Sequence, residues 1–289
     1  MDTSKPLVSI CCITYNQAAF LPDALKGFLI QKVNFPIEII IYDDCSQDAT
    51  RDLLRNFRKS CPHPVTLLLS EENRYSKGER ILPKTFAKAQ GTYIALCEGD
   101  DYWTDPLKLQ KQVDFLEANE GYNICFHNVE IYNSETGKIL EDTITGKVPE
   151  TTTIKNLVGR NYIHTPSVIL RNNFTLPEWF REVVIGDWSL YMIQVKDKKI
   201  KKLPDIMAVY RVREGAMWST QTKTVKKAGS RKTVEVLATN GEFPQAIKNR
   251  LLYKLAGKDK EPSLKERCMM QLKKIIGPIY RILWKKKTI

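Results

Sequence analysis

The sequence predicts an α/β fold in which a mixed, mainly parallel sheet is flanked by helices and followed by a helical, basic C-terminal extension. Apolar β-branched runs alternate with segments of helical spacing four times between residues 7 and 97, a pattern typical of parallel strands joined by right-handed crossovers. Polar residues fall directly after the apolar runs. Because a parallel sheet forms its ligand site at the carboxyl ends of its strands, these polar residues are expected at one common rim.

The expected elements follow in a regular order along the chain. Residues 7–13 form a nearly continuous apolar run that ends in a polar loop, which indicates a buried strand. The same kinds of pattern predict further strands at 37–42, 65–69, 93–97, 124–132 and 167–170, and helices at 20–30, 49–58, 83–89, 106–117 and within 179–194 after about residue 186. From about residue 221 onward the sequence is helical and basic.

The composition is that of a compact globular protein. A chain of 289 residues can bury a substantial core. Its 43% of hydrophobic and 27% of charged residues exclude a disordered or fibrous class. The seven cysteines lie mostly in apolar runs and form no CxxC pair, so we expect them to be reduced residues of the core.

The formal net charge of +12 implies attraction to an anionic partner. Much of the basic excess lies after Lys196, whereas the acidic residues concentrate in the first half of the chain. This asymmetry favours a membrane-surface or product-binding role for the C-terminal part over a nucleic-acid face. The chain also has no recognisable nucleic-acid-binding module, so no nucleic-acid partner is expected.

Both ends of the chain bear on its location. Met1 is followed almost directly by the first predicted strand, which leaves no room for a signal peptide, and no stretch reaches the ~18 apolar residues of a spanning helix. We therefore expect a cytoplasmic protein whose membrane contact, if any, is peripheral. Residues 264–289 are amphipathic and basic, interrupted at Gly277-Pro278, and suit either a helix on anionic lipid or a helix packed on the domain.

An acidic cluster follows the strand predicted at 93–97. It consists of Glu98, Asp100 and Asp101. A hard divalent cation takes oxygen ligands and neutralises the oxygens of a nucleoside diphosphate, so this cluster suits a metal bound between protein and diphosphate. Acidic pairs also cap helices, but Asp105 already supplies a cap for the next helix.

A second acidic pair, Asp43 and Asp44, follows the second predicted strand. A helix cap at Ser46 or Asp48 explains the end of this segment but not two adjacent acids before it. A carboxylate at this place can accept a hydrogen bond from a base N–H or a ribose hydroxyl. Tyr15, in the loop after the first strand, offers a stacking face for the same base.

Together these segments resemble the inverting glycosyltransferases of the large family two, which have the GT-A fold. The resemblance rests on residues 7–10, 14–16, 31, 38–50, 91–94 and 98–101. It is strong over about residues 5–115 and recognisable to about residue 219. The domains implied are a catalytic domain at 1–220, with a nucleotide-binding half at about 5–115 and an acceptor-side half at about 116–220, and the basic extension at 221–289.

The resemblance assigns roles to the polar residues. It implies a divalent metal, Mn²⁺ or Mg²⁺, on Asp101 with Glu98, where the family usually has aspartate in place of Glu98. Arg213 stands where family members commonly have histidine, and a guanidinium cannot ligate a cation but can hold phosphate oxygens. The residues implied to bind the nucleotide are Thr14, Tyr15, Asn16, Asp43, Asp44, Asp100 and Arg213.

Inverting transfer needs a base that takes the proton of the acceptor hydroxyl. Asp187, in the sequence Ile185-Gly186-Asp187-Trp188, matches the context in which the family places this carboxylate. An N-cap of the following helix is the structural alternative for Asp187, and both roles can hold together.

Aromatic side chains and one histidine are candidates for the sugar and acceptor side. The apolar face of a pyranose packs well on an aromatic ring, although core packing is the commoner fate of tryptophan. The candidates are Trp103, Trp188, Trp218 and His164.

The resemblance implies transfer from a nucleotide-diphosphate sugar, with a UDP-sugar expected, to a saccharide or lipid-linked acceptor in surface polysaccharide assembly. A dinucleotide-binding oxidoreductase would instead need GxGxxG after the first strand, and residues 14–19 contain no glycine. The remaining alternative is a catalytically inactive member that binds only a nucleotide sugar or a glycan.

Overall fold

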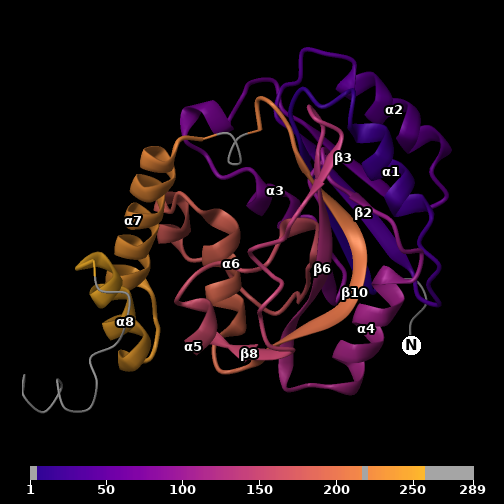
Figure 1. Cartoon of the computed structure of the whole chain (residues 1–289). Helices are drawn as coiled ribbons and strands as arrows, with labels where there is room; N and C mark the ends of the chain where they lie inside the picture. The colour runs from indigo at the N-terminus through magenta and orange to yellow at the C-terminus, as the bar shows by residue number, and fades with distance from the viewer. Residues whose placement is uncertain (1–4, 217–220, 258–289) are drawn as a thin grey trace, which may run out of the picture.

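The computed structural model describes residues 5–216 and 221–257, which form one ten-stranded sheet with helices on both faces (Figure 1). The strands are β1 (Val8–Thr14), β2 (Ile37–Asp43), β3 (Val65–Leu69), β4 (Tyr93–Leu96), β5 (Tyr102–Trp103), β6 (Tyr122–Asn133), β7 (Lys138–Leu140), β8 (Thr151–Thr153), β9 (Ile169–Arg171) and β10 (Lys199–Val212). They lie in the order β3-β2-β1-β4-β9-β6-β10-β5, with β7 beside β6 and β8 beside β10. This mixed sheet confirms the predicted fold class.

The first four strands form the parallel part of the sheet. β1 pairs with β2 and with β4, and β2 pairs with β3, all in parallel. β1 and β2 are buried along their whole length, as the continuous apolar runs predict. Thr14 and Asp43 are partners at the carboxyl ends of β1 and β2, so the loops that follow these strands meet at one rim.

The second part of the sheet combines parallel and antiparallel pairs. β9 runs antiparallel to both β4 and β6 and so joins the two parts of the sheet. β6 and β10 pair in parallel, and β5 pairs antiparallel with β10. The end of β10 reaches the rim of the first part, because the N–H of Arg211 donates to Asp101 Oδ1 at 2.8 Å.

β10 is the longest strand among the described residues, and it is not among the strands that the sequence predicts. Proline in the middle of a run argues against a strand, and Pro204 stands inside this one. The pairing with β6 shifts register between Leu203 and Ile206, where a bulge accommodates the proline. The basic run before Pro204 is not wholly solvated, because Lys202 is 8% exposed and its ammonium donates to Thr145 O at 3.2 Å.

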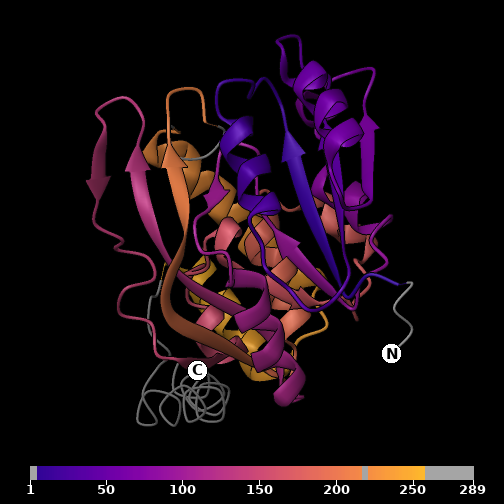
Figure 2. The ribbon, with the colours of Figure 1, turned by 90° about the vertical axis from the view of Figure 1, so that its right-hand side faces the viewer.

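Helices cover both faces of the sheet, as Figures 1 and 2 show. They are α1 (Leu21–Leu29), α2 (Thr50–Ser60), α3 (Leu82–Phe86), α4 (Lys108–Ala118), α5 (Ile154–Leu157), α6 (Gly186–Val195), α7 (Lys223–Asn240) and α8 (Gln245–Leu255), with short 3-10 helices η1 (Tyr75–Lys77), η2 (Thr165–Ser167) and η3 (Glu178–Glu182). α1, α2 and α4 pack on one face, whereas α3, α5, α6, α7 and α8 lie on the other. Alternate residues of β1 serve the two cores, Ile10 and Cys12 in one and Cys11 in the other.

The C-terminal extension is helical where the structure describes it, and it packs against the rest of the chain. Val234, Leu237 and Leu251 are at most 1% exposed and share a hydrophobic cluster with Trp188 of α6. The amphipathic segment 264–289 lies outside the described residues. None of the described helices is long and apolar enough to cross a membrane.

Candidate active site

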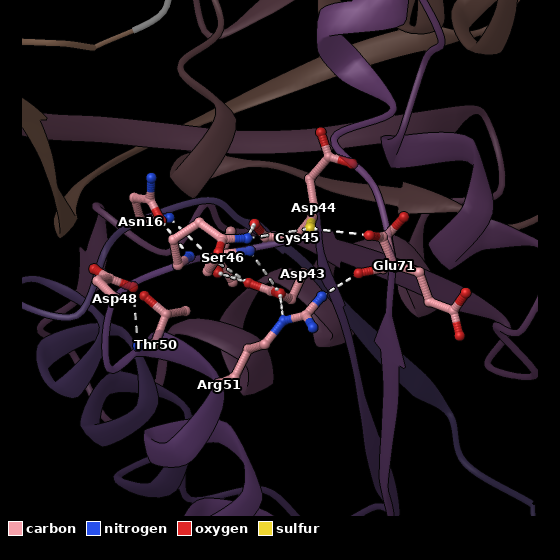
Figure 3. Close-up of polar contacts among 12 residues, drawn as sticks. Asn16, Asp43, Asp44, Cys45, Ser46, Asp48, Thr50, Arg51 and Glu71 are labelled. Carbon is pink, nitrogen blue, oxygen red and sulfur yellow. Dashed lines mark hydrogen bonds and ion pairs between the residues drawn. The ribbon is translucent and has the colours of Figure 1, made fainter.

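The buried carboxylate of Asp43 fixes the loop after β2. It is 0% exposed and accepts hydrogen bonds from Thr14 Oγ1 at 3.3 Å, from Arg51 Nε at 2.6 Å and from the Ser46 hydroxyl. Figure 3 shows this cluster between the β2 loop and α2. Thr14 is itself 2% exposed, so the side chains of Thr14 and Asp43 contact each other inside the rim, and their contact with the nucleotide stays a prediction. They hold the rim in place from within.

Asp44 joins the loop after β2 to the loop after β3. It is 1% exposed, and its two oxygens accept the backbone N–H groups of Arg74 at 2.8 Å and Tyr75 at 2.9 Å. In Figure 3 its carboxylate points away from Asp43 and Arg51. Each carboxylate oxygen has a second lone pair, so Asp44 remains a candidate acceptor for a base N–H.

Two residues of the rim have a left-handed backbone, Asn16 with φ 49° and Cys45 with φ 68°. Such conformations cost of the order of 1–3 kcal/mol and cluster at functional sites. Two hydrogen bonds between the loops maintain them, because Asn16 N donates to Ser46 Oγ at 2.8 Å and Gln47 N donates to Asn16 Oδ1 at 2.8 Å. The neighbouring Tyr15 is 39% exposed, which leaves a face for the base stacking that the sequence predicts.

The acidic cluster after β4 contains a carboxylate oxygen without a protein partner. Asp101 is 2% exposed, and its Oδ1 accepts the N–H of Arg211 at 2.8 Å. Its Oδ2 is buried and has no hydrogen-bond partner within the part of the chain that the structure describes. A buried, unpaired carboxylate oxygen is costly, so this atom marks a position that an external ligand can fill.

Two carboxylates of the cluster, Glu98 and Asp101, have a raised pKa. Desolvation, followed by the charges of Asp100 and Asp187, raises the pKa of Glu98 to about 8. Desolvation and the charges of Asp100 and Glu98 raise the pKa of Asp101 well above its ordinary value. Among residues 5–216 and 221–257 no group of three or more His, Cys, Asp or Glu side chains could hold a metal alone.

Two guanidinium groups lie beside the acidic cluster, that of Arg211 in β10 and that of Arg213 just after the strand ends. Arg213 Nε lies 2.8 Å from Asp100 Oδ2, while Arg211 donates to Asp100 O at 2.9 Å and to Asp23 Oδ2 at 2.7 Å. The guanidinium carbons of Arg211 and Arg213 lie 5.1 Å and 5.0 Å from the centre of the Phe20 ring. Arg211 is buried and structural, whereas the half-buried Arg213 can reach phosphate oxygens. Arg211 is not among the predicted site residues, although it stands only two residues before Arg213 in the sequence.

Asp187 lies in the first turn of α6 and borders the acidic cluster. Its Oδ2 accepts from Asn161 Nδ2 at 2.7 Å, and its Oδ1 accepts from Trp188 N at 2.7 Å. Burial raises the pKa of Asp187, and the charge of Asp187 in turn contributes to the raised pKa of Glu98, so the two carboxylates lie near enough to interact electrostatically. Ile185 occupies the N-cap position of α6, so the structural alternative for Asp187 as N-cap is not realised.

Two of the predicted sugar-stacking residues belong to the core. Trp103 is 2% exposed, packs against Phe28 with ring centres 5.0 Å apart, and donates its indole N–H to Pro166 O at 2.8 Å. Trp188 is 2% exposed and donates its indole N–H to Leu157 O at 2.9 Å. The prediction that these rings face a sugar is wrong, because each fills the core on one face of the sheet.

The other two candidates for the acceptor side differ in outcome. His164 is 6% exposed, its Nε2 lies 3.2 Å from Asp142 Oδ1, and its ring centre lies 4.9 Å from that of Tyr210. These contacts hold the His164 ring beside Asp142 and Tyr210, and a direct contact with the acceptor stays a prediction. Trp218 lies outside the described residues.

The family model for glycosyl transferase family 2 matches residues 9–174. The chain belongs to this family. The matched segment includes Tyr15, Asp44 and the acidic cluster, and it ends before Asp187 and Arg213. The family segment thus contains the nucleotide side of the candidate site, and the candidate base lies beyond it.

Proteins similar in sequence match the chain over different lengths. The uncharacterized protein Rv1520 of Mycobacterium tuberculosis is 35% identical over 211 residues, which are 73% of this chain and 60% of that protein. The putative teichuronic acid biosynthesis glycosyltransferase TuaG of Bacillus subtilis is 36% identical over 116 residues, which are 40% of this chain and 44% of that protein. The chain therefore spans less than two thirds of the length of these relatives.

A solved structure confirms the GT-A fold. The crystal structure of residues 1–349 of S. aureus TarS in complex with UDP-GlcNAc matches the chain with a TM-score of 0.65 at 19% sequence identity. The match covers 86% of this chain and 71% of the TarS chain.

Proposed function

We propose that the chain is an inverting glycosyltransferase that moves a sugar from a UDP-sugar to a saccharide or lipid-linked acceptor in surface polysaccharide assembly. The observation that carries the proposal is that Asp101 Oδ2 is buried without a partner among the described residues, in an acidic cluster on which the charge of Asp187 also acts. Family membership supports it. The UDP-GlcNAc bound to TarS and the teichuronic acid role in the name of TuaG support the donor and the pathway class.

Asp187 acts as the general base in this proposal. The acceptor oxygen forms a bond to the anomeric carbon while the bond from that carbon to the diphosphate breaks on the opposite face, and the diphosphate leaves with the electron pair. The carboxylate takes the proton of the acceptor hydroxyl. Burial raises the pKa of Asp187 toward neutrality, where a carboxylate is a stronger base, and the hydrogen bond from Asn161 orients it.

The acidic cluster and Arg213 hold the diphosphate in this proposal. Asp101, with Glu98, would bind Mn²⁺ or Mg²⁺, and the unpaired Oδ2 of Asp101 fits that role. A divalent cation supplies charge neutralisation for the leaving diphosphate. Arg213 would leave Asp100 and turn its guanidinium to phosphate oxygens, which frees Asp100 for the ribose.

The nucleoside lies over the loops after β1 and β2 in this proposal. The exposed ring of Tyr15 provides the stacking face. Asp44 accepts a base N–H through the lone pairs that the amides of Arg74 and Tyr75 leave unused. Asn16 is exposed at the same rim and adds a side-chain amide.

A thermal-shift screen of nucleotide sugars, with and without manganese, tests base, sugar and metal together. We expect a UDP-sugar to raise the melting temperature only when manganese is present. The wild-type protein should then hydrolyse or transfer that donor, and Asp187→Asn should lose turnover while donor binding survives. Wild-type turnover in Asp187→Asn would remove this residue from the mechanism. Donor binding without turnover by the wild-type protein would instead identify an inactive, binding-only member.

A further inference from the structure

Helix α7 of the C-terminal extension contacts the segment that leads into Asp187. Thr233 lies inside α7 and is 0% exposed. Its hydroxyl oxygen accepts the backbone N–H groups of Val184 at 3.1 Å and Ile185 at 3.0 Å. The same hydroxyl donates to Gly229 O at 2.9 Å, so its one donor and both lone pairs are in use.

These two accepted hydrogen bonds fix the start of α6. Ile185 is the N-cap of α6 and provides no side-chain cap. Without Thr233 the N–H groups of Val184 and Ile185 would be left without this acceptor, which is costly where the backbone is shielded from water. Because Asp187 follows in the first turn of α6, the place of its carboxylate depends on this anchor.

A second contact from the extension lies on the other side of Asp187 in the sequence. Lys254 of α8 holds its ammonium 4.7 Å from the ring centre of Trp188 and donates to Gly159 O. Figure 1 shows α7 and α8 along the side of α5 and α6 that faces away from the sheet. The extension thus contacts Val184 and Ile185, which precede Asp187, and Trp188, which follows it.

We propose that Thr233 is a positioning residue for Asp187, which makes α7 a working part of the active centre. This proposal rests on the proposed function, in which Asp187 is the base. A base must lie within hydrogen-bond reach of the proton that it takes, and a misplacement of about 1 Å costs roughly a hundredfold in rate. Loss of the Thr233 hydroxyl lets the start of α6 move toward other hydrogen-bond partners and carries the carboxylate with it.

Thr233→Val removes the hydroxyl and keeps the shape of the side chain. We expect kcat for donor hydrolysis or transfer to fall by roughly tenfold to a hundredfold. The Kd for the donor should stay at the wild-type value, because Tyr15 and Asp44 are untouched. Thr233→Ser retains the hydroxyl and should restore most of kcat. Thr239→Val, at an exposed position of α7, is the matched control for effects on the helix itself.

A wild-type kcat in Thr233→Val would overturn the proposal, and so would a Thr233→Ser variant as impaired as Thr233→Val. If Thr233→Val does not fold, amide hydrogen exchange on the wild-type protein tests the hydrogen bonds from Val184 and Ile185 to Thr233 instead. Slow exchange at Val184 and Ile185 supports the anchor, and exchange as fast as in an open loop overturns it. Failure of the proposed function gives a different result. In that case Asp187→Asn would retain turnover, independently of the turnover measured for Thr233→Val.

Discussion

The hydrogen bond from Asn161 to Asp187 leads to a prediction about pH dependence. Burial raises the pKa of Asp187, while the bonds from Trp188 N–H and Asn161 lower it. Asn161 Nδ2 lies 2.7 Å from Asp187 Oδ2, a length typical of a bond to a charged acceptor. Asn161→Ala removes this donor and leaves the burial in place, so the pKa of Asp187 should rise further.

The expected size of the effect follows from the energy of such a bond. A hydrogen bond to a charged group contributes about 1.5–3 kcal/mol. Its loss changes the equilibrium between carboxylate and carboxylic acid by roughly tenfold to a hundredfold. The base acts only when deprotonated, so activity falls as the pH drops through its pKa. The acidic limb of kcat/KM should therefore move to higher pH in Asn161→Ala, with activity well above the limb close to wild type.

The measurement is UDP release across a range of pH, with the donor that the thermal-shift screen identifies. His164, Glu98 and Tyr191 also interact electrostatically with Asp187, so variant and wild type must be compared under the same conditions. Asn161→Asp keeps the size of the side chain but places a second carboxylate beside the base, so it should move the limb further than Asn161→Ala.

An acidic limb at the wild-type position in both Asn161 variants would refute the reasoning. Asn56→Ala, at an exposed position of α2, is the matched control and should overlay the wild-type profile. A drop in activity that is equal at all pH values would show that Asn161 acts through folding or placement and not through the protonation of Asp187.

Three further predictions concern the donor site and the core. Arg213→Ala should weaken UDP binding by roughly tenfold, as expected for one lost bond to a charged group, and unchanged affinity by isothermal titration would count against a phosphate contact. Asp101→Asn should abolish the manganese-dependent thermal shift, and a full manganese response would exclude Asp101 as a ligand. Burial lowers the pKa of Lys108 to about 7, so the unfolded chain binds this proton more tightly and the free energy of unfolding should rise with pH above 7. Lys108→Met should reduce that rise in urea titrations, and an identical slope in the variant would contradict the assignment.

The parallel strands could be predicted from the sequence because their signals are local. The strand predicted at 65–69 coincides with β3, the one predicted at 37–42 ends one residue before β2 does, and the one predicted at 7–13 is shifted by one residue from β1. A strand buried on both faces is a continuous apolar run, which can be recognised without knowledge of its neighbours.

β10 and the roles of the tryptophans depend on tertiary contacts, which a local pattern does not contain. Lys202 and Arg211 are buried in β10 because partners distant in the sequence, Thr145 O and Asp23, accept their hydrogen bonds. Each therefore resembles a surface charge when only its neighbours in sequence are considered. Trp103 follows an acidic cluster, and only its contact with Phe28 shows that the ring belongs to the core.

Some residues of the candidate site could likewise be predicted from sequence motifs, whereas others could not. The motif positions of Asp44 and Asp101 place them at the rim that the structure describes. Asn161 and Thr233 have no motif, because their importance depends on where their side chains meet the segment around Asp187. Residues that position a candidate catalytic side chain through tertiary contacts therefore could not be predicted from this sequence.

In the proposed mechanism, the ion pair between Arg213 and Asp100 couples the binding of metal and nucleotide. In the free protein each charge neutralises the other at 2.8 Å, so phosphate oxygens must compete with Asp100 for Arg213. A divalent cation on the neighbouring Asp101 and Glu98 adds positive charge that replaces Arg213 beside Asp100 and lets the guanidinium turn to the diphosphate. The two ligands should then bind cooperatively, each lowering the Kd of the other by the same factor. UDP titrations at several manganese concentrations measure that factor, and a UDP affinity independent of manganese would show that the pair opens for either ligand alone.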